Sequence, residues 1–434
     1  MATTLVLVAA GLVWLLAVRW QIRELYPAWY WYLAGYPVTA LRILRSWSKV
    51  AQLNDLTVSR RPPRSLLGDV IVRGEALRPA PPRIGFPKPT PTGVLLVVRL
   101  HPGQTPAPFI AAADALAHAW RVHAVRVTSP ERGIVHLLAT DCDPLQRPGI
   151  ATARTELLSA VVGVLETGAA WVIDLRLVAH WLVTGATQSG KSNLLARLVA
   201  QFAPQKVALV GIDCKGGMEL GLFAPRLSAL TTSRREAVTV LDALVVEMHE
   251  RMATCRAAMV RSIWELPKSL RPVPIVVIVD ELAELYLHDG TREGRQEAER
   301  CSTLLLRITQ LGAALGLHVV VVGQRVGSEL GPGVTALRAQ LSGRVCHRVN
   351  DPGTAEMTLG DVNKEAVVAA QSITAREKGV AITTDADGRW TRARSHKTTT
   401  EEARDIAAKY AELTPTLRTV RTALLEATEG GGAS

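Results

Sequence analysis

Cysteine is scarce in this sequence of 434 residues, and it forms no pattern typical of a metal site. The five cysteines, at positions 142, 214, 255, 301 and 346, include no C-x-x-C pair and have no histidine partner at zinc spacing. This spacing argues against a zinc site and predicts buried free thiols in a reducing compartment. Cys346, beside His347, is expected to pack within a strand.

Acidic residues are too few to balance the basic ones. The 39 Asp and Glu residues face 50 Lys and Arg residues, which gives a formal net charge of +11. Such a chain attracts polyanions such as nucleic acid or anionic lipid, although the excess alone defines no site. At this length the chain has room for two or three domains, and it contains no internal repeat.

Charge is absent from one stretch near the N-terminus. The segment from Thr3 to Val18, TTLVLVAAGLVWLLAV, is apolar almost throughout, and at about 1.5 Å per residue it is slightly shorter than a typical bilayer core. The aromatic cluster Trp29–Tyr32 suits the headgroup level of a membrane, as part of a second span or an interfacial helix. Basic residues follow at positions 42, 45, 49, 60 and 61.

This order predicts a membrane anchor of one or two hydrophobic helices over residues 1–49. The basic residues behind it place the rest of the chain in the cytoplasm, at the cell membrane. Two alternatives stay open. One is a cleaved signal peptide, which the lack of a preceding Lys or Arg and of a clear cleavage site disfavours. The other is a pair of helices packed in a soluble domain.

Proline and arginine dominate the next segment, and its composition predicts an extended linker over residues 50–92. Beyond it, VLLVVRL, an apolar helical stretch from Phe109 to Trp120, VHAVRV and GIVHLLA predict a small α/β module over residues 93–150, in the order strand, helix, strand, strand. The last segment, residues 401–434, is expected to form one or two helices and a flexible end.

The stretch HWLVTGATQSGKSNLL carries the spacing G-x-x-x-x-G-K-S between an apolar run and a helical pattern. A glycine-rich loop in this position turns its backbone N–H groups toward a polyphosphate. We therefore predict that the loop binds ATP and that Lys191 contacts the β and γ phosphates, while Ser192 holds Mg²⁺. The predicted ATP-binding residues are Gly185, Ala186, Thr187, Gln188, Ser189, Gly190, Lys191 and Ser192.

A second apolar run, Ile275–Val279, ends in Asp280 and Glu281. A strand of this kind delivers both acids to one edge of a sheet. Asp280 is predicted to hold Mg²⁺, and Glu281 is predicted to orient or deprotonate an attacking water, so that Glu281 and Lys191 are the catalytic candidates. We expect no metal other than Mg²⁺. An N-K-x-D segment is missing, because the nearest string, NKEA from Asn363, fails at its last position; this excludes a small GTPase.

From Leu175 to about Thr384, apolar strands alternate with helical patterns. This alternation predicts an α/β fold, a RecA-like P-loop ATPase core with a mainly parallel sheet covered by helices, over residues 151–400. In the helix expected from Arg234 to Val260, one face is predicted to pack in the core, formed by Val238, Leu241, Val245, Met248 and Met252.

The order of the segments resembles a known family. Behind the P-loop come VGIDCKGGMELGLF from Val210, the Asp280–Glu281 strand, LGLHVVVVGQRVG from Leu315 and LSGRVCHRVNDPGTAEMTLGD from Leu341. This order resembles the FtsK/SpoIIIE family of double-stranded DNA translocases. Within that family, the sequence of these motifs is most similar to that of the Tra-type proteins that move integrative and conjugative elements between mycelial actinobacteria.

The resemblance implies a ring, usually a hexamer, that threads duplex DNA through its centre and hydrolyses ATP between subunits. Asp213 and Lys215 match the family's D-x-K-G element. The resemblance also implies a γ-phosphate sensor or a trans-acting group, for which the candidates are Gln324, Arg325, Arg344 and Arg348. Arg344 and Arg348 are candidates for reaching either a neighbour's nucleotide or the DNA, a partner that is contacted by scattered basic loops and by no compact motif.

Two departures from the family pattern affect this interpretation. The usual T-Q-R-P reads GQRV here, with Gly323 and Val326, and the usual Arg-Ala ahead of the following strand reads Ala313-Ala314. Conjugal transfer is favoured over chromosome segregation. A coupling or export ATPase that moves single-stranded DNA or protein, and a membrane scaffold that only senses nucleotide, remain alternatives.

Overall fold

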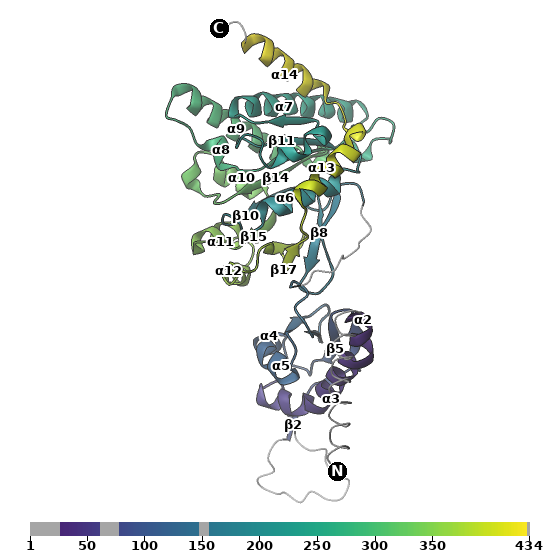
Figure 1. Ribbon diagram of the computed structural model, residues 1–434. Helices are drawn as coiled ribbons and strands as arrows, with labels where there is room; N and C mark the ends of the chain where they lie inside the picture. The colour runs from purple at the N-terminus through teal and green to yellow at the C-terminus, as the bar shows by residue number, and fades with distance from the viewer. Residues whose placement is uncertain (1–26, 61–77, 147–155, 432–434) are drawn as a thin grey trace, which may run out of the picture. The chain divides into compact units, whose positions relative to one another are not determined.

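The computed structural model describes residues 27–60, 78–146 and 156–431, and the chain divides into two compact units between Arg147 and Pro148 (Figure 1). Each unit has its own sheet and its own hydrophobic core. The apolar stretch Thr3–Val18 lies outside the described residues. Within the described ranges, no helix is long and apolar enough to cross a membrane.

The N-terminal unit is built on a five-stranded antiparallel sheet. The strand order is β3-β5-β7-β6, and β4 pairs with β5. The expected order strand, helix, strand, strand is present as β5, α4 with α5, β6 and β7. The elements of this unit are α2 (Pro27–Tyr30), η1 (Trp31–Gly35), α3 (Tyr36–Leu53), β1 (Val58–Arg60), β2 (Arg78–Ala80), β3 (Arg83–Ile84), β4 (Lys88–Thr90), β5 (Gly93–Arg99), α4 (Ala107–Ala111), α5 (Ala113–Trp120), β6 (Ala124–Thr128) and β7 (Ile134–Thr140).

The aromatic segment considered as a second membrane span packs instead against this sheet. Through α2, the π-helical turn η1 and α3 it forms one continuous helical stretch, whose inner side buries Trp31, Ile43 and Trp47 in the same core as Leu96 and Trp120. The prediction of a second span is wrong for these residues. Apolar spacing alone did not distinguish a helix that faces lipid from one that buries one side against a sheet.

The predicted linker is also partly wrong, because β3 and β4 belong to the sheet. The proline-rich segment is attached to the helix by aromatic donors: Trp31 Nε1 donates to Thr90 O (2.8 Å), Tyr36 Oη to Pro87 O (2.8 Å) and Trp47 Nε1 to Pro82 O (2.9 Å). Proline lacks an N–H but keeps its carbonyl acceptor. Composition therefore suggested an isolated linker. In the tertiary structure, aromatic side chains of the helix donate hydrogen bonds to the carbonyls of this segment and hold it in place.

The larger unit contains a mixed sheet of ten strands, in the order β12-β11-β13-β14-β10-β15-β16-β17-β8-β9. The strands from β12 to β15 pair in parallel, and those from β15 to β9 pair antiparallel. The prediction of a mainly parallel sheet therefore holds for only one side of the sheet. Strands such as β8 are buried along nearly their whole length, and their sequences are therefore continuous apolar runs, as is typical of parallel strands. The sequence pattern did not distinguish the two directions.

The strands of the larger unit alternate with helices along most of the chain. They are β8 (Ser159–Leu165), β9 (Ala170–Asp174), β10 (His180–Thr184), β11 (Ala208–Ile212), β12 (Ala229–Thr231), β13 (Ile275–Val279), β14 (Leu317–Gly323), β15 (Gly343–His347), β16 (Val380–Thr384) and β17 (Trp390–Ser395). The α-helices are α6 (Lys191–Phe202), α7 (Arg234–Ala257), α8 (Ala283–Tyr286), α9 (Arg292–Leu311), α10 (Val334–Gln340), α11 (Pro352–Leu359), α12 (Lys364–Gln371), α13 (Thr400–Lys409) and α14 (Arg418–Gly431). Short 3₁₀ turns are η2 (Leu220–Arg226), η3 (Ile263–Glu265), η4 (Ala313–Leu315), η5 (Ser328–Leu330) and η6 (Ala411–Leu413).

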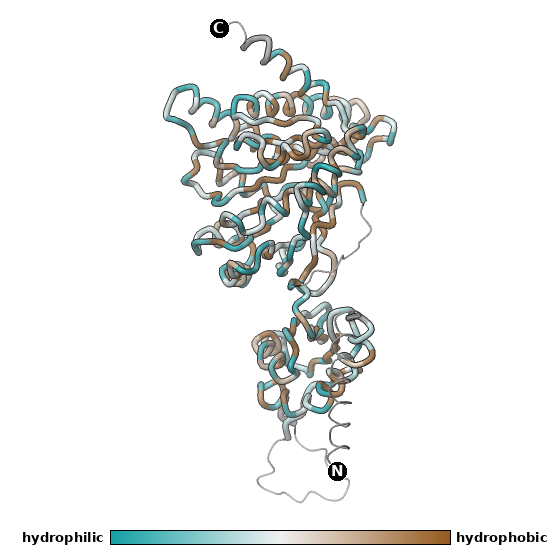
Figure 2. Tube along the Cα trace, in the orientation of Figure 1, coloured by the Kyte–Doolittle hydropathy of each residue, from teal (hydrophilic) through white to brown (hydrophobic). Residues whose placement is uncertain are grey.

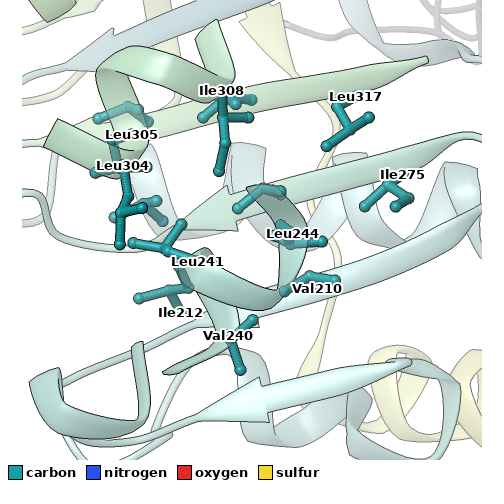
Figure 3. Close-up of a cluster of buried hydrophobic side chains, with 14 of the residues drawn as sticks. Val210, Ile212, Val240, Leu241, Leu244, Ile275, Leu304, Leu305, Ile308 and Leu317 are labelled. Carbon is teal, nitrogen blue, oxygen red and sulfur yellow. The ribbon is translucent and has the colours of Figure 1, made fainter. Parts of the chain in front are cut away.

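The parallel strands are buried on both faces, and their alternate residues enter two different cores. In β13, Ile275 and Val277 pack with α7 and α9, whereas Val276 and Ile278 pack with α6 on the other face. Figure 3 shows the first core, where side chains of α7 and α9 meet those of the strands. Strands of this unit are accordingly hydrophobic in Figure 2, while the outer sides of its helices are more polar.

Helix α7 buries a slightly different stripe from the expected one. Ala237, Leu241, Leu244 and Met248 are fully or nearly fully buried against the sheet, whereas the predicted core residues Val238, Val245 and Met252 are only partly buried. Helix α14 packs on α7. The predicted tail thus contributes two helices, α13 and α14, to the larger unit.

The cysteines are free, as their spacing predicted, but they are not all buried. Cys255, Cys301 and Cys346 are buried, Cys214 is half-buried and Cys142 is exposed. Cys346 lies within β15, where packing was expected. Burial raises the pKa of the Cys346 thiol to about 11 and that of the Cys301 thiol to about 12, so both are packed as protonated side chains.

Two buried histidines lie where β10 and β14 begin. His180 Nδ1 accepts a hydrogen bond from Val319 N–H (3.1 Å), and His318 Nδ1 donates to Ala179 O (3.3 Å). Both Nε2 atoms are buried and have no hydrogen-bond partner among the described residues. Burial lowers the pKa of His180 to about 4 and that of His318 to about 3.

The packing of α3 predicts unequal costs for two adjacent truncations. Ile43 is fully buried, whereas Leu44 is 41% exposed. Ile43→Ala should lower the free energy of unfolding of its unit by about 2–5 kcal/mol, because it leaves a cavity, and Leu44→Ala by less than about 1 kcal/mol. Denaturant unfolding of the full chain in detergent measures both. Equal costs would contradict the packing of α3 on the sheet.

The buried histidines predict acid sensitivity. The folded-state pKa of His318 lies below its unfolded value, so the unfolded chain takes up the proton first. The stability that neutral His318 contributes is present above about pH 6.5 and is lost as the pH falls toward 3. His318→Asn should reduce the loss of unfolding free energy between pH 7 and 4 by about 1–3 kcal/mol. His249→Asn, at an exposed position of α7, serves as the control; an equal effect there would contradict the assignment.

Candidate nucleotide-binding site

The P-loop connects β10 to α6 and is closely packed on its inner side. Gly185 and Gly190 have φ angles of +151° and +121°, values that L side chains rarely adopt. A Cβ on Gly185 would lie 2.7 Å from His347 Cβ, and one on Gly190 would lie 2.6 Å from Gly379 Cα. The loop therefore keeps bare backbone at both positions, as a phosphate cradle requires.

Lys191 is the first residue of α6, and its side chain turns back over the loop. Its Nζ donates to Gly185 O (2.6 Å) and Ala186 O (3.0 Å). Burial lowers the pKa of Lys191, an effect that the nearby carboxylate of Glu281 opposes. Ser192 follows it at the helix N-terminus, where its side chain is exposed. A cation and a hydroxyl are thus both placed at the end of a helix that favours anions.

The two predicted acids follow β13 directly and are both buried, with relative exposures of 6%. Asp280 N–H donates to Ile212 O (3.0 Å) and Leu282 N–H to Val322 O (2.9 Å), so both neighbouring strands hold this turn. Burial, with the added charge of Asp213, raises the pKa of Asp280 to about 6. The Asp280 carboxylate and the Ser192 hydroxyl offer oxygen donors, the ligand type that suits a hard cation such as Mg²⁺.

Asp213 and Lys215 lie at the start of the loop after β11. Asp213 binds backbone of the loop, whereas Lys215 forms an ion pair with a residue that follows another strand. The Asp213 carboxylate accepts from the backbone N–H groups of Glu219 (2.9 Å), Leu220 (3.0 Å) and Lys215 (3.3 Å). It therefore folds the loop around itself. Lys215 reaches across to β13, where its Nζ lies 3.1 Å from Glu281 Oε2.

Glu281 is held from two sides. Besides Lys215, the backbone N–H of Gln324 donates to Glu281 Oε1 (3.2 Å). The Gln324 side chain accepts a weak hydrogen bond from Thr187 Oγ1 in the P-loop (3.5 Å). Gln324 thus lies between the P-loop and Glu281, where a sensor was predicted.

The GQRV departure has a local structural cause. A Cβ on Gly323 would lie 2.9 Å from Val326 Cγ2 and 3.4 Å from Glu281 Oε1. Val326 is itself buried in the core beside α10. A threonine at position 323 would therefore press on both Val326 and the carboxylate, so the two substitutions fit each other.

The three candidate arginines lie in different surroundings. Arg325 is exposed and pairs with Glu329 (2.6 Å) and Asp351 (3.2 Å). Arg344 is buried within β15, where its guanidinium donates to Arg338 O (2.9 Å) and Leu341 O, and burial lowers its pKa to about 10. The Arg344 guanidinium thus donates to carbonyls of its own chain.

Arg348 lies directly against the P-loop of its own chain. Its guanidinium donates to Thr187 O (3.3 Å) and to Asn350 Oδ1 (2.8 Å), and its carbonyl accepts from Ala186 N–H (2.8 Å). The structure thus places this candidate beside the nucleotide site of the same subunit. Ala313 and Ala314 lie in η4 at the start of β14, the opposite edge of the sheet, where their carbonyls accept from Trp264 Nε1 and Ser262 Oγ.

Sequence reasoning missed three residues that support the loop. Gly379 N–H donates to Ser189 O (2.9 Å), which attaches the start of β16 to the P-loop. Asn193 of α6 donates to His396 O (2.8 Å) and accepts from Thr398 N–H (2.9 Å). His347 is fully buried behind Gly185 and donates from Nδ1 to Val380 O (3.0 Å). The one available signal was the residue after the motif, since Asn193 is a polar residue in the first turn of α6.

The fold and this arrangement define a P-loop ATPase with a mixed α/β sheet. Comparison with known proteins extends this class. The family model described as the actinomycete conjugal transfer protein N-terminal domain matches residues 17–141, and that of the FtsK/SpoIIIE family matches residues 145–328. The transfer protein TraSA of Streptomyces ambofaciens is 42% identical over 387 residues, which cover 86% of this chain and 93% of TraSA.

A DNA translocase FtsK of Campylobacter jejuni is 29% identical over 224 residues, which cover 49% of this chain and 22% of that protein. The solved structure of the pCW3 conjugation coupling protein TcpA, a monomer form with ATPγS, is 19% identical and has a TM-score of 0.57, with 86% of this chain and 99% of that chain covered. That similarity shows a shared fold. The extent of identity to TraSA shows that this chain belongs to the FtsK/SpoIIIE family, among its conjugal transfer proteins.

The close approach of Gly379 predicts the effect of a small change in the P-loop. Gly190→Ala should weaken ATP binding by more than about tenfold, because the new methyl group must displace backbone at a φ of +121°. Gly221→Ala is the matched control, since no atom lies within 4 Å of that Cβ. Equilibrium binding of a fluorescent ATP analogue measures both, and wild-type affinity in Gly190→Ala would contradict the packing described.

Proposed function

We propose that this protein is a membrane-anchored, ATP-driven motor that moves double-stranded DNA during conjugal transfer. The observation that carries this proposal is the buried acid pair Asp280–Glu281 at the end of β13, beside the P-loop and connected to it through Gln324. A scaffold that only binds nucleotide needs the loop. A motor also needs a group that activates water.

The residues divide the work of ATP hydrolysis as follows. The P-loop amides and Lys191 bind the phosphates, and Ser192 and Asp280 hold Mg²⁺, which neutralises charge on the phosphate oxygens when bound. Glu281 orients the attacking water and accepts its proton. Gln324 and Arg348 would contact the γ phosphate from within the same subunit, and the support for this is that each touches Thr187.

Duplex DNA is the proposed substrate. The family membership and the name of the FtsK relative, DNA translocase, support it, and a net charge of +11 favours a polyanion. The subunits are proposed to form a ring, a hexamer, around the duplex. Contacts to the phosphate backbone would then come from basic loops, independent of base sequence.

Attachment to the cell membrane is proposed for the segment that precedes the described residues. The uncharged run Thr3–Val18 and the basic residues that follow it support a single anchor with the ATPase in the cytoplasm. Helix α3 is not part of this anchor, since its inner side is buried in the N-terminal unit.

The proposal predicts the DNA dependence of ATP turnover by the full-length chain in detergent. Long duplex should raise the turnover number at least about tenfold, because a motor couples hydrolysis to movement along its track. Single strands should have little effect. Stimulation by single strands alone would favour a coupling or export ATPase, and turnover that ignores DNA would favour the nucleotide-sensing scaffold.

The role of Glu281 makes a separate prediction. Glu281→Gln should lower duplex-stimulated turnover by about two to four decades, because loss of a general base costs that much, and should leave ATP binding intact. Steady-state turnover and nucleotide affinity measure the two effects. Glu293→Gln, at an exposed position of α9, is the control. Unimpaired turnover in Glu281→Gln would reject this residue as the base.

A further inference from the structure

Lys215 is a second lysine in the candidate site, and the proposed function gives it no task. Its side chain is 40% exposed, and its Nζ lies 3.1 Å from Glu281 Oε2, whose own side chain is 6% exposed. The exposed partner therefore has water and space around it, while the carboxylate has neither. In this pair, the lysine is the group that is free to leave.

The loop that carries Lys215 combines a firm base with an open tip. Three backbone N–H groups bind the Asp213 carboxylate at the base. At the tip, Gly216 and Gly217 have φ angles of +78° and +72°, and Gly216 has no atom within 4 Å of its Cβ position. The backbone directly after Lys215 is thus turned sharply and is unpacked at Gly216, whereas Gly217 has Thr232 close to its Cβ position and donates to Asp213 O (3.1 Å). The Lys215 side chain, next to the unpacked position, can therefore change direction without a change in the core.

Glu281 is presented in a different way. Its Oε1 is fixed by the backbone N–H of Gln324, and its Oε2 is occupied by Lys215. A carboxylate whose second oxygen faces an ammonium group is a poor acceptor for a proton from water, because transfer of that proton would break the ion pair. The pair therefore holds the proposed base in place and also blocks it.

The surrounding charges indicate what would draw Lys215 away. Lys191 lies close enough for its charge and that of Lys215 to oppose each other, and Lys191 lies over the P-loop. Lys215 is therefore within electrostatic range of the place where the γ phosphate of a bound nucleotide is expected. A γ phosphate carries more charge than one carboxylate and offers three oxygens to an ammonium group.

We infer that Lys215 is a positioning residue whose ion pair changes when a nucleoside triphosphate binds. Its ammonium group then leaves Glu281 and pairs with the γ phosphate. This exchange frees Glu281 Oε2 for water only when a γ phosphate is present, and it adds a cation to the phosphate from within the same subunit. A nucleoside diphosphate does not trigger it. The inference rests on the proposed ATP-driven function, but it concerns binding and not movement.

Equilibrium binding tests the exchange without any need for turnover or DNA. The full-length chain is titrated with ATPγS and with ADP as wild type, Lys215→Ala, Glu281→Gln and the double variant. If Lys215 must leave Glu281, Glu281→Gln should tighten ATPγS binding about threefold to tenfold more when Lys215 is present than when it is replaced. For ADP the coupling factor should stay within about twofold of unity.

Simple charge repulsion gives a different result. A loss of repulsion between Glu281 and the phosphate would tighten ATPγS binding equally in both backgrounds, and that additivity would overturn the inference. Lys215→Arg should restore most of the coupling, whereas Lys268→Ala, at an exposed site outside the pair, should leave all affinities unchanged. Coupling that is equal for ADP and ATPγS would also overturn the exchange.

The outcomes separate this inference from the proposed function. ATPγS-specific coupling in a chain whose turnover ignores duplex DNA would support the exchange and reject the motor. Duplex-stimulated turnover with additive binding effects would support the motor and reject the exchange. Absence of any nucleotide binding by the wild type would overturn both.

Discussion

The parallel hydrogen-bonded register of β11, β13, β14, β10 and β15 is the constraint on which the site depends. Because these strands run in one direction, their carboxyl ends meet at one edge of the sheet. That edge collects the P-loop after β10, the Lys215 loop after β11, the acid pair after β13, Gln324 after β14 and Arg348 after β15. These segments are distant in sequence, and a slip of one strand would separate them.

Close packing at this edge then restricts which residues can be present. Gly185 and Gly190 leave room for His347 and for the start of β16, and Gly323 leaves room for Val326 and for the carboxylate of Glu281. The geometry of the site therefore depends on close contacts at glycine positions as much as on its functional side chains. The departures from the usual family sequence at positions 323 and 326 are therefore coupled by packing, and they are not two independent substitutions.

The N-terminal unit shows the limit of composition as a guide. An aromatic helix and a proline-rich segment suggested a membrane and a linker, but Trp31, Tyr36 and Trp47 donate hydrogen bonds to carbonyls of the proline-rich segment. By itself, the helical segment would leave its indole and phenol donors without these acceptors, and its apolar side would be exposed. The hydrogen bonds join the two segments, because the donors come from one and the acceptors from the other, while the core forms between the helix and the sheet.

The sequence by itself determined the P-loop, the acid pair and the alternation of strands and helices in the larger unit, since these depend on local spacing and apolar periodicity, and the order of its motifs carried the resemblance to the family. Tertiary structure decided the rest. It placed Arg348 at its own P-loop and buried Arg344 in β15, it paired Lys215 with Glu281, and it made the sheet mixed. Such outcomes depend on contacts between residues tens to hundreds of positions apart, and apolar periodicity does not record the direction of a strand or the partner of a charge.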